Sequence, residues 1–204
     1  KDACLLTEYD RDRRWATVYH MDLQKPTAKD TLFDLSINND YENPGSPVME
    51  RLTNGDWVVA QDGDWLYYNS EGASDAGQFP RLDKINLKTK AKQTLYQSAD
   101  KSFEEFIAFA GKGRDRILTR YQSKTEVPNF FMVNLADKSR NALTKFTDPA
   151  PQLTGIEKRV VKYNRPDGVP LSGTLYLPAN YKPGQKLPLF MWAYPLEYSD
   201  KSTA

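Results

Sequence analysis

The feature that most limits how this chain can fold is an internal repeat. Residues 5–23 (LLTEYDRDRRWATVYHMDL) align without a gap on residues 117–135 (ILTRYQSKTEVPNFFMVNL). A third copy, residues 66–87, has a longer loop but the same ending. The three endings are Asp22-Leu23, Asn86-Leu87 and Asn134-Leu135. A repeat of this size predicts a fold made of similar units placed side by side.

Each copy reads as two strands joined by a polar loop, since Tyr, Phe, Val and Thr are concentrated between Asp, Asn and Gly clusters. Further strands are expected after the copies, around residues 32–33, 95–96 and 143, and before the later two, at 57–61 and 103–109. Meanders of about four strands, with copies 64 and then 48 residues apart, favour the blades of a β-propeller over a sandwich. The predicted class is all-β, a partial β-propeller of about three four-stranded antiparallel blades. Natural rings carry about four to eight blades, so we expect a fragment.

A domain boundary is predicted where residues 146–155 (FTDPAPQLTG) interrupt the strand pattern. It separates a partial propeller, residues 1–153, from residues 154–204. The second part should begin with antiparallel strands at 156–163 and 171–177, followed by a turn around Pro183-Gly184. Residues 187–194 are apolar at successive positions, which predicts a strand buried on both faces, as in the opening of an α/β domain. Only about ten residues remain to cover it, which again indicates a segment of a longer protein.

Composition argues against several partners. Lys plus Arg number 28 and Asp plus Glu 27, and this balance disfavours nucleic acid and acidic membrane surfaces. No run approaches the roughly 18 apolar residues of a membrane helix. With one Cys and one His, neither an internal disulfide nor a zinc site is expected, and no cofactor is indicated. The chain opens at Lys1 without a signal peptide, so we expect a removed leader and a periplasmic or otherwise exported protein.

Two residues invite a catalytic role but are better explained by structure. His20 has the side chain most often used as a general base, yet it lies within a strand and the other copies have no matching histidine. Cys4 begins an apolar strand, so an inert, half-buried thiol is favoured over a nucleophile.

Three short motifs have similar alternatives. The interleaved charges of residues 10–14 (DRDRR) predict a solvated turn in preference to an anion-binding patch. Glu104-Glu105 could bind a substrate amine through paired carboxylates, but the surrounding FEEFIAF pattern favours ordinary strand positions. Residues 111–113 (GKG) lie between strands and therefore predict a turn, because a phosphate loop would open a helix.

Residues 167–178 (DGVPLSGTLYLP), followed by Lys186-Leu187-Pro188-Leu189 and Trp192-Ala193-Tyr194-Pro195, resemble the entry into the catalytic domain of the prolyl oligopeptidase family of serine peptidases. The similarity is greatest to the glutamyl endopeptidase branch, because Tyr194-Pro195 precedes Glu197-Tyr198. Residues 43–47, 71–74 and 148–153 are similar to the same branch's propeller.

The resemblance implies a seven-bladed propeller that caps an α/β-hydrolase domain with a Ser, Asp and His triad. This sequence has no G-x-S-x-G turn, so the triad is expected beyond Ala204 and the fragment should be inactive. Tyr194 matches the tyrosine that donates a hydrogen bond to the oxyanion in this family, although Pro195 follows it where Gly or Ala is more usual. The alternative for Tyr194 is an aromatic residue that packs at a strand end.

In this interpretation the propeller restricts access of peptide substrates to the catalytic cavity, and preference for Glu rests on the branch alone. The rival hypothesis is a non-catalytic propeller that binds proteins or glycans. Exposed edge strands would also invite swapping or pairing between copies of the fragment.

Overall fold

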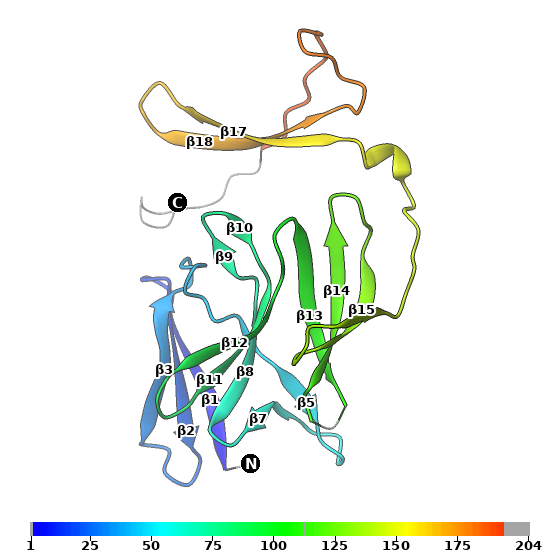
Figure 1. The fold of residues 1–204 in the computed structure, drawn as a ribbon. Helices are drawn as coiled ribbons and strands as arrows, with labels where there is room; N and C mark the ends of the chain where they lie inside the picture. The colour runs from blue at the N-terminus through cyan, green and yellow to red at the C-terminus, as the bar shows by residue number, and fades with distance from the viewer. Residues whose placement is uncertain (1, 112, 194–204) are drawn as a thin grey trace. The chain divides into compact units, whose positions relative to one another are not determined.

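The computed structural model describes residues 2–111 and 113–193, whose regular elements are strands apart from one 3-10 turn, η1 (Pro151–Leu153). The chain divides into two units, Lys1–Phe146 and Thr147–Ala204 (Figure 1). The predicted boundary between residues 153 and 154 stays a prediction. None of the described helices is long and apolar enough to cross a membrane.

The first unit contains three antiparallel meanders. The first sheet is β1 (Ala3–Asp10), β2 (Trp15–Asp22) and β3 (Lys29–Ser36), in that order. The second has the order β12-β11-β8-β4, with β7 also paired to β8; its members are β4 (Ser46–Pro47), β7 (Gln61–Asp62), β8 (Trp65–Ser70), β11 (Arg81–Asn86) and β12 (Lys92–Gln97). The third contains β13 (Ser102–Ala110), β14 (Arg116–Ser123), β15 (Asn129–Asn134) and β16 (Arg140–Ala142). Two small hairpins lie between strands of the second sheet along the chain: β5 (Met49–Arg51) with β6 (Trp57–Val59), and β9 (Ala73–Ser74) with β10 (Gly77–Gln78). The all-β class is confirmed, while the number of blades stays a prediction.

The repeated endings have a structural reason. The leucine that ends each copy donates its backbone N–H to the residue just before the copy's first strand: Leu23 to Asp2 at 2.7 Å, Leu87 to Asp64 at 2.8 Å and Leu135 to Asp115 at 2.8 Å. The residue before each leucine accepts a backbone N–H from two residues on through its side-chain Oδ1: Asp22 at 2.8 Å, Asn86 at 3.0 Å and Asn134 at 2.8 Å. Asp and Asn suit this position because their short side chains close turns.

The gapless alignment of residues 5–23 on 117–135 matches structurally equivalent residues in the second strand of each copy. In the first strand of each copy it is one residue out of register. Leu5 lies opposite His20, three residues before the closing leucine, whereas Ile117 lies opposite Val133, two residues before it. The structural counterpart of Ile117 is therefore Cys4. A shift of one residue moves a side chain to the other face of a sheet, so structure is needed to assign the faces.

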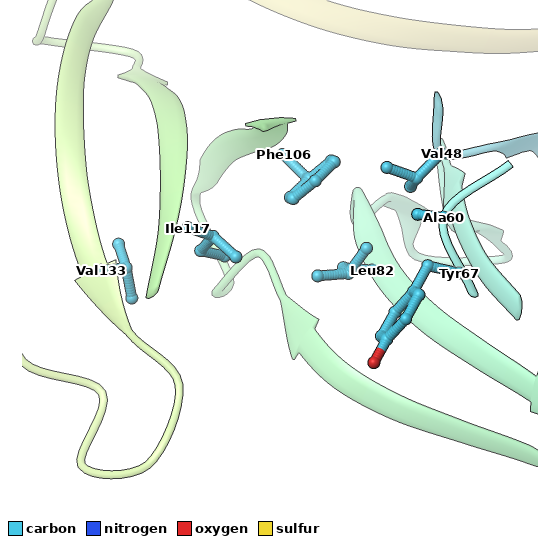
Figure 2. Close-up of a cluster of buried hydrophobic side chains, with 7 residues drawn as sticks. All are labelled: Val48, Ala60, Tyr67, Leu82, Phe106, Ile117 and Val133. Carbon is cyan, nitrogen blue, oxygen red and sulfur yellow. The ribbon is translucent and has the colours of Figure 1, made fainter. Parts of the chain in front are cut away.

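The core of the first unit lies between neighbouring sheets. One cluster joins the second and third sheets and contains Val48, Ala60, Tyr67, Leu82, Phe106, Ile117 and Val133 (Figure 2). Another joins the first and second sheets and contains Leu32, Leu66, Tyr68, Ile85 and Leu87. Strands β8 and β11 of the second sheet thus contribute side chains to both clusters, because alternate side chains of a strand point to opposite faces.

The second unit has one hairpin, β17 (Glu157–Asn164) paired antiparallel with β18 (Pro170–Leu177). Both predicted strands are confirmed. Arg165 and Asp167 form an ion pair of 2.6 Å in the connecting turn, where Gly168 has a φ of +85° that suits glycine. All eight side chains of β17 are exposed, so this hairpin has no buried core of its own among the described residues.

The strand predicted at 187–194 is not observed over its described part, residues 187–193. These residues have no regular secondary structure, and Phe190 and Trp192 are 90% and 80% exposed. A strand needs a neighbour for its backbone hydrogen bonds, and β17 and β18 pair only with each other in the described part of this unit. The apolar sequence alone was therefore a poor guide here.

Candidate functional site

Tyr194, the one predicted catalytic residue, lies outside the described residues, so its role stays a prediction. The buried polar groups among the described residues belong to the first unit. They are centred on two neighbouring glutamates of β13.

Glu104 and Glu105 do not form a carboxylate pair. Consecutive side chains of a strand point to opposite faces, and here Glu104 is only 3% exposed while Glu105 is half-buried. Glu104 faces the second sheet, and Glu105 forms a 3.1 Å ion pair with Arg120 of β14 on the other face. The hypothesis that both carboxylates bind one amine is therefore wrong.

Glu104 is held by several donors. The Thr119 hydroxyl donates to Oε1 at 2.6 Å, and the Arg140 guanidinium lies 3.6 Å from Oε2. Tyr96, from the second sheet, donates its hydroxyl to the same carboxylate. Burial raises the pKa of Tyr96, and the hydrogen bond to Glu104 raises it further. A buried charge needs such partners, so this group links the second and third sheets.

Arg140 completes the network from β16. Its guanidinium lies 4.3 Å from the ring centroid of Tyr121 and 3.8 Å from that of Phe131. The two rings meet edge to face at 5.8 Å. Stacking on aromatic faces favours a cation and holds the guanidinium beside Glu104. Sequence reasoning missed Arg140 and Tyr96 because neither belongs to a motif and both reach Glu104 through tertiary structure: Tyr96 comes from the second sheet and Arg140 from β16 of the third.

A polar cavity of about 480 Å³ lies at the end of β8, and Glu105, Glu71, Asp40 and Ser70 contribute to its lining. Its carboxylates have the charge to attract a cationic group. However, Glu71 already accepts a hydrogen bond from Gln78 at 2.6 Å, and Glu105 is paired with Arg120. The local donors therefore satisfy much of this charge.

His20 and Cys4 occupy ordinary strand positions. His20 lies in β2, opposite Leu5 of β1 and Asp30 of β3, and is half-buried. Cys4 is a half-buried free thiol in β1 opposite Met21. These positions agree with structural roles for both side chains.

The two predicted loops are turns between strands. Asp10 Oδ1 accepts backbone N–H groups of Asp12 at 3.1 Å and Arg13 at 3.0 Å, and the charged side chains around it are mostly exposed. Gly111 has a φ of +84° in the connection from β13 to β14, while Lys112 lies outside the described residues. Within the described ranges no group of three or more His, Cys, Asp or Glu side chains could hold a metal ion.

Comparison with known proteins connects the chain to one group of enzymes. No family model matches it. It is 34% identical over 197 residues to a protein of Oryza sativa subsp. japonica named probable glutamyl endopeptidase, chloroplastic, covering 89% of this chain and 21% of that protein. The corresponding Arabidopsis thaliana protein is 33% identical over 190 residues, covering 85% of this chain and 20% of its own length. The chain thus spans about a fifth of the length of these curated relatives.

Among solved structures, a putative dipeptidyl aminopeptidase IV from Bacteroides ovatus matches 92% of this chain and 34% of its own, with 13% identity and a TM-score of 0.46. A likeness of that size decides neither fold nor activity. The sequence matches to the plant proteins are much stronger and extend across both units. The chain is therefore a homologue of part of the proteins named glutamyl endopeptidase, which are peptidases of the prolyl oligopeptidase family.

Proposed function

We propose that this chain is the sheet-rich part of a longer serine peptidase that hydrolyses peptides on the carboxyl side of glutamate. The three meanders form part of a wall that restricts which peptides reach the catalytic centre. The hairpin β17–β18 begins the hydrolase domain, and the Ser, His and Asp groups are supplied by residues outside this sequence. The chain alone is expected to be inactive.

The observation that carries this proposal is the identity of 34% with a probable glutamyl endopeptidase across 89% of the chain. The match includes the hairpin unit as well as the meanders, so it does not come from repeated strands alone. Residues 167–178 and Tyr194-Pro195 resemble the entry into the family's catalytic domain. The absence of a G-x-S-x-G turn from this sequence is the reason for placing the nucleophile elsewhere.

In the proposed reaction the serine oxygen attacks the peptide carbonyl while histidine accepts its proton. The Tyr194 hydroxyl donates a hydrogen bond to the oxygen that becomes negatively charged. A donor of this kind acts mainly in the transition state, and its loss typically lowers turnover by about 10² to 10³. Tyr194 is therefore the residue of this chain that we assign to the chemistry.

The experiment uses the longer protein that contains this sequence. Tyr194→Phe should lower kcat about 100-fold with little change in KM, measured on a fluorogenic peptide with Glu at the cleaved bond. Tyr181→Phe, in the turn after β18, serves as the matched tyrosine control and should leave both constants unchanged. Unchanged kcat in Tyr194→Phe would refute the oxyanion role.

The peptidase assignment has its own readouts. The longer protein should form a covalent adduct with a serine-reactive fluorophosphonate and should cleave the Glu peptide faster than its Gln analogue. A folded protein that forms no adduct would support a binding platform instead. Equal cleavage of the Glu and Gln peptides would retain the peptidase and reject the glutamyl preference.

A further inference from the structure

The polar cavity at the end of β8, which we call the acidic cavity, is lined by residues from all three meanders of the first unit. Asp40 comes from the connection after β3, Ser70 and Glu71 come from the end of β8 and the residue after it, and Phe103 and Glu105 come from β13. Its volume of about 480 Å³ is many times the ~30 Å³ that one water molecule occupies in the liquid. The space is therefore large enough to admit a side chain.

Negative charge in the acidic cavity is only partly balanced. Its lining includes three carboxylates, and none of the described Lys, Arg or His residues lines it. Glu105 pairs with Arg120 at 3.1 Å, whereas Gln78 gives Glu71 a hydrogen bond without a charge. The local donors thus supply one positive charge against three negative ones. A cationic group in the cavity would complement the remaining charge.

The hydroxyl group of Ser70 is a second and independent observation at the same place. Ser70 lines the cavity and is 7% exposed, and its Oγ has no hydrogen-bond partner among the described residues. Most buried polar groups in folded proteins are paired, because an unpaired one costs stability. A donor that enters the acidic cavity would provide the hydrogen bond that this oxygen lacks.

The walls of the cavity are held in place without a ligand. A Cβ at Gly45 would overlap the backbone carbonyl of Asn69, so the connection after β3 and strand β8 approach each other as closely as their backbones permit. The Tyr41 hydroxyl donates to Asp75 at 2.8 Å, which links the same connection to the turn between β9 and β10. A preformed cavity loses little conformational freedom when it binds a ligand.

The arrangement of the acceptors favours a guanidinium group over a metal ion. Oxygen ligands must lie within about 2.3–2.6 Å of one calcium ion, and within the described ranges no group of three or more acidic, His or Cys side chains could do so. A guanidinium has five N–H donors in one plane and can reach acceptors that lie apart. It also stacks on aromatic rings, and Phe103 lines the cavity.

We propose that the acidic cavity binds an arginine side chain of a peptide. The guanidinium donates to Ser70 Oγ and to the carboxylates of Asp40 and Glu71, and the aliphatic part of the side chain packs beside Phe103. Because Asp40 and Glu71 are exposed, the attraction is weakened by salt. This inference goes beyond the proposed peptidase activity and does not depend on it.

The test is an NMR titration of the 204-residue chain with Nα-acetyl-arginine methylamide as the probe. The amide signals of Ser70, Gly72 and Glu105 should shift together as the probe is added. Nα-acetyl-citrulline methylamide has the same length and no charge, and its Kd should be at least about tenfold higher, because hydrogen bonds to charged donors are the stronger ones. The corresponding lysine derivative should also bind more weakly than the arginine derivative.

Two variants in the cavity and one outside it sharpen the result. Ser70→Ala should raise the Kd of the arginine derivative about tenfold, as expected for one hydrogen bond to a charged group. It should not lower the urea midpoint of the free chain, because Oγ bonds to none of the described residues. Glu71→Gln keeps the shape of the side chain and should raise Kd at least about threefold by removing a charge. Glu42→Gln is the control, since Glu42 accepts from Asn39 outside the lining, and its Kd should be unchanged.

Several outcomes would overturn the proposal. Equal affinity for the arginine and citrulline derivatives would show that charge does not determine binding. An unchanged Kd in Ser70→Ala, together with a lower urea midpoint, would give the hydroxyl a structural role only. Tighter binding of the lysine derivative, or displacement of the arginine derivative by an equal concentration of calcium ions, would mean that the cavity suits another kind of cation.

Discussion

The contact between the second and third sheets and the contact between the first and second sheets are built differently, although the repeat relates them. The former buries seven hydrophobic side chains and surrounds the carboxylate of Glu104 with donors. The latter buries five and leaves a cavity of about 1160 Å³. The third sheet contributes the nine-residue inner strand β13, whereas the described first sheet has only three strands. Similar repeat units thus give unequal contacts, and in the part of the chain that the structure describes the first sheet has no counterpart of β13.

The largest expected effect comes from truncating one phenylalanine in each contact. Phe106→Ala should lower the free energy of unfolding by about 3–5 kcal/mol, because Phe106 is 5% exposed and its loss leaves a cavity. Phe33→Ala should cost less than half as much, because Phe33 is half-buried and already borders open space. Urea unfolding of the 204-residue chain, followed by tryptophan fluorescence, measures both values.

Equal losses of unfolding free energy in Phe106→Ala and Phe33→Ala would contradict the difference between the two sheet contacts. They would mean that the contact between the first and second sheets is as closely packed as the other. A larger loss for Phe33→Ala would reverse the assignment of the stronger contact. Phe130→Ala, a half-buried phenylalanine of β15 outside the core cluster, is a control for general loss of aromatic area.

Much of the fold could be predicted because strand period and turn chemistry are local. The Asp22-Leu23 type of ending identified each hairpin, since one side chain closes the turn and the next backbone N–H bonds across the strands. Which face each first strand presents could not be predicted. The loops that connect the two strands differ by one residue in length, so Leu5 and Ile117 occupy different positions in their sheets. The gapless sequence alignment gives no sign of this difference.

The candidate site was less predictable for a related reason. Glu104 and Glu105 were predicted as ordinary strand positions, and strand alternation indeed separates the carboxylates, but the sequence did not indicate how unlike their surroundings are. Tyr96 meets Glu104 through the packing of the second sheet on the third, and Arg140 meets it through the order of strands within the third sheet, so no local pattern marks either residue. The apolar run at 187–194 was predicted as a strand, but its described part, residues 187–193, has no neighbouring strand to pair with, and an apolar sequence cannot supply one.

Removing one arginine on each face of the third sheet sharpens the comparison further. Arg140→Ala should destabilise the chain by about 3 kcal/mol, because it leaves the buried Glu104 without its cation. Arg120→Ala removes a more exposed ion pair with Glu105 and should cost at most about 1 kcal/mol. Chemical unfolding at low and high salt checks both, and only the Arg120 pair should be sensitive to salt. If the two variants lose equal stability, Glu104 is not a buried charge that depends on Arg140.

A smaller effect than that of Arg140→Ala is expected of Tyr96→Phe, which removes one hydroxyl from the contact between the second and third sheets. Its hydrogen bond to the carboxylate of Glu104 should contribute about 1–2 kcal/mol at neutral pH. The pKa of Tyr96 is raised by burial and by Glu104, so the folded state keeps the hydroxyl protonated more strongly than the unfolded state does. This contribution is complete below the unfolded value of about 10 and is lost as the pH rises above it.

The stability difference between the wild-type chain and Tyr96→Phe should therefore be constant from pH 7 to 9 and shrink between pH 10 and 11. Burial also raises the pKa of Tyr68 to about 12, but Tyr68 is present in both proteins and its effect cancels in the difference. Urea midpoints collected across this pH range give the measurement. A difference that stayed constant to pH 11 would show that Tyr96 ionises alike in both states, and Glu104 would then lose its partner from the second sheet.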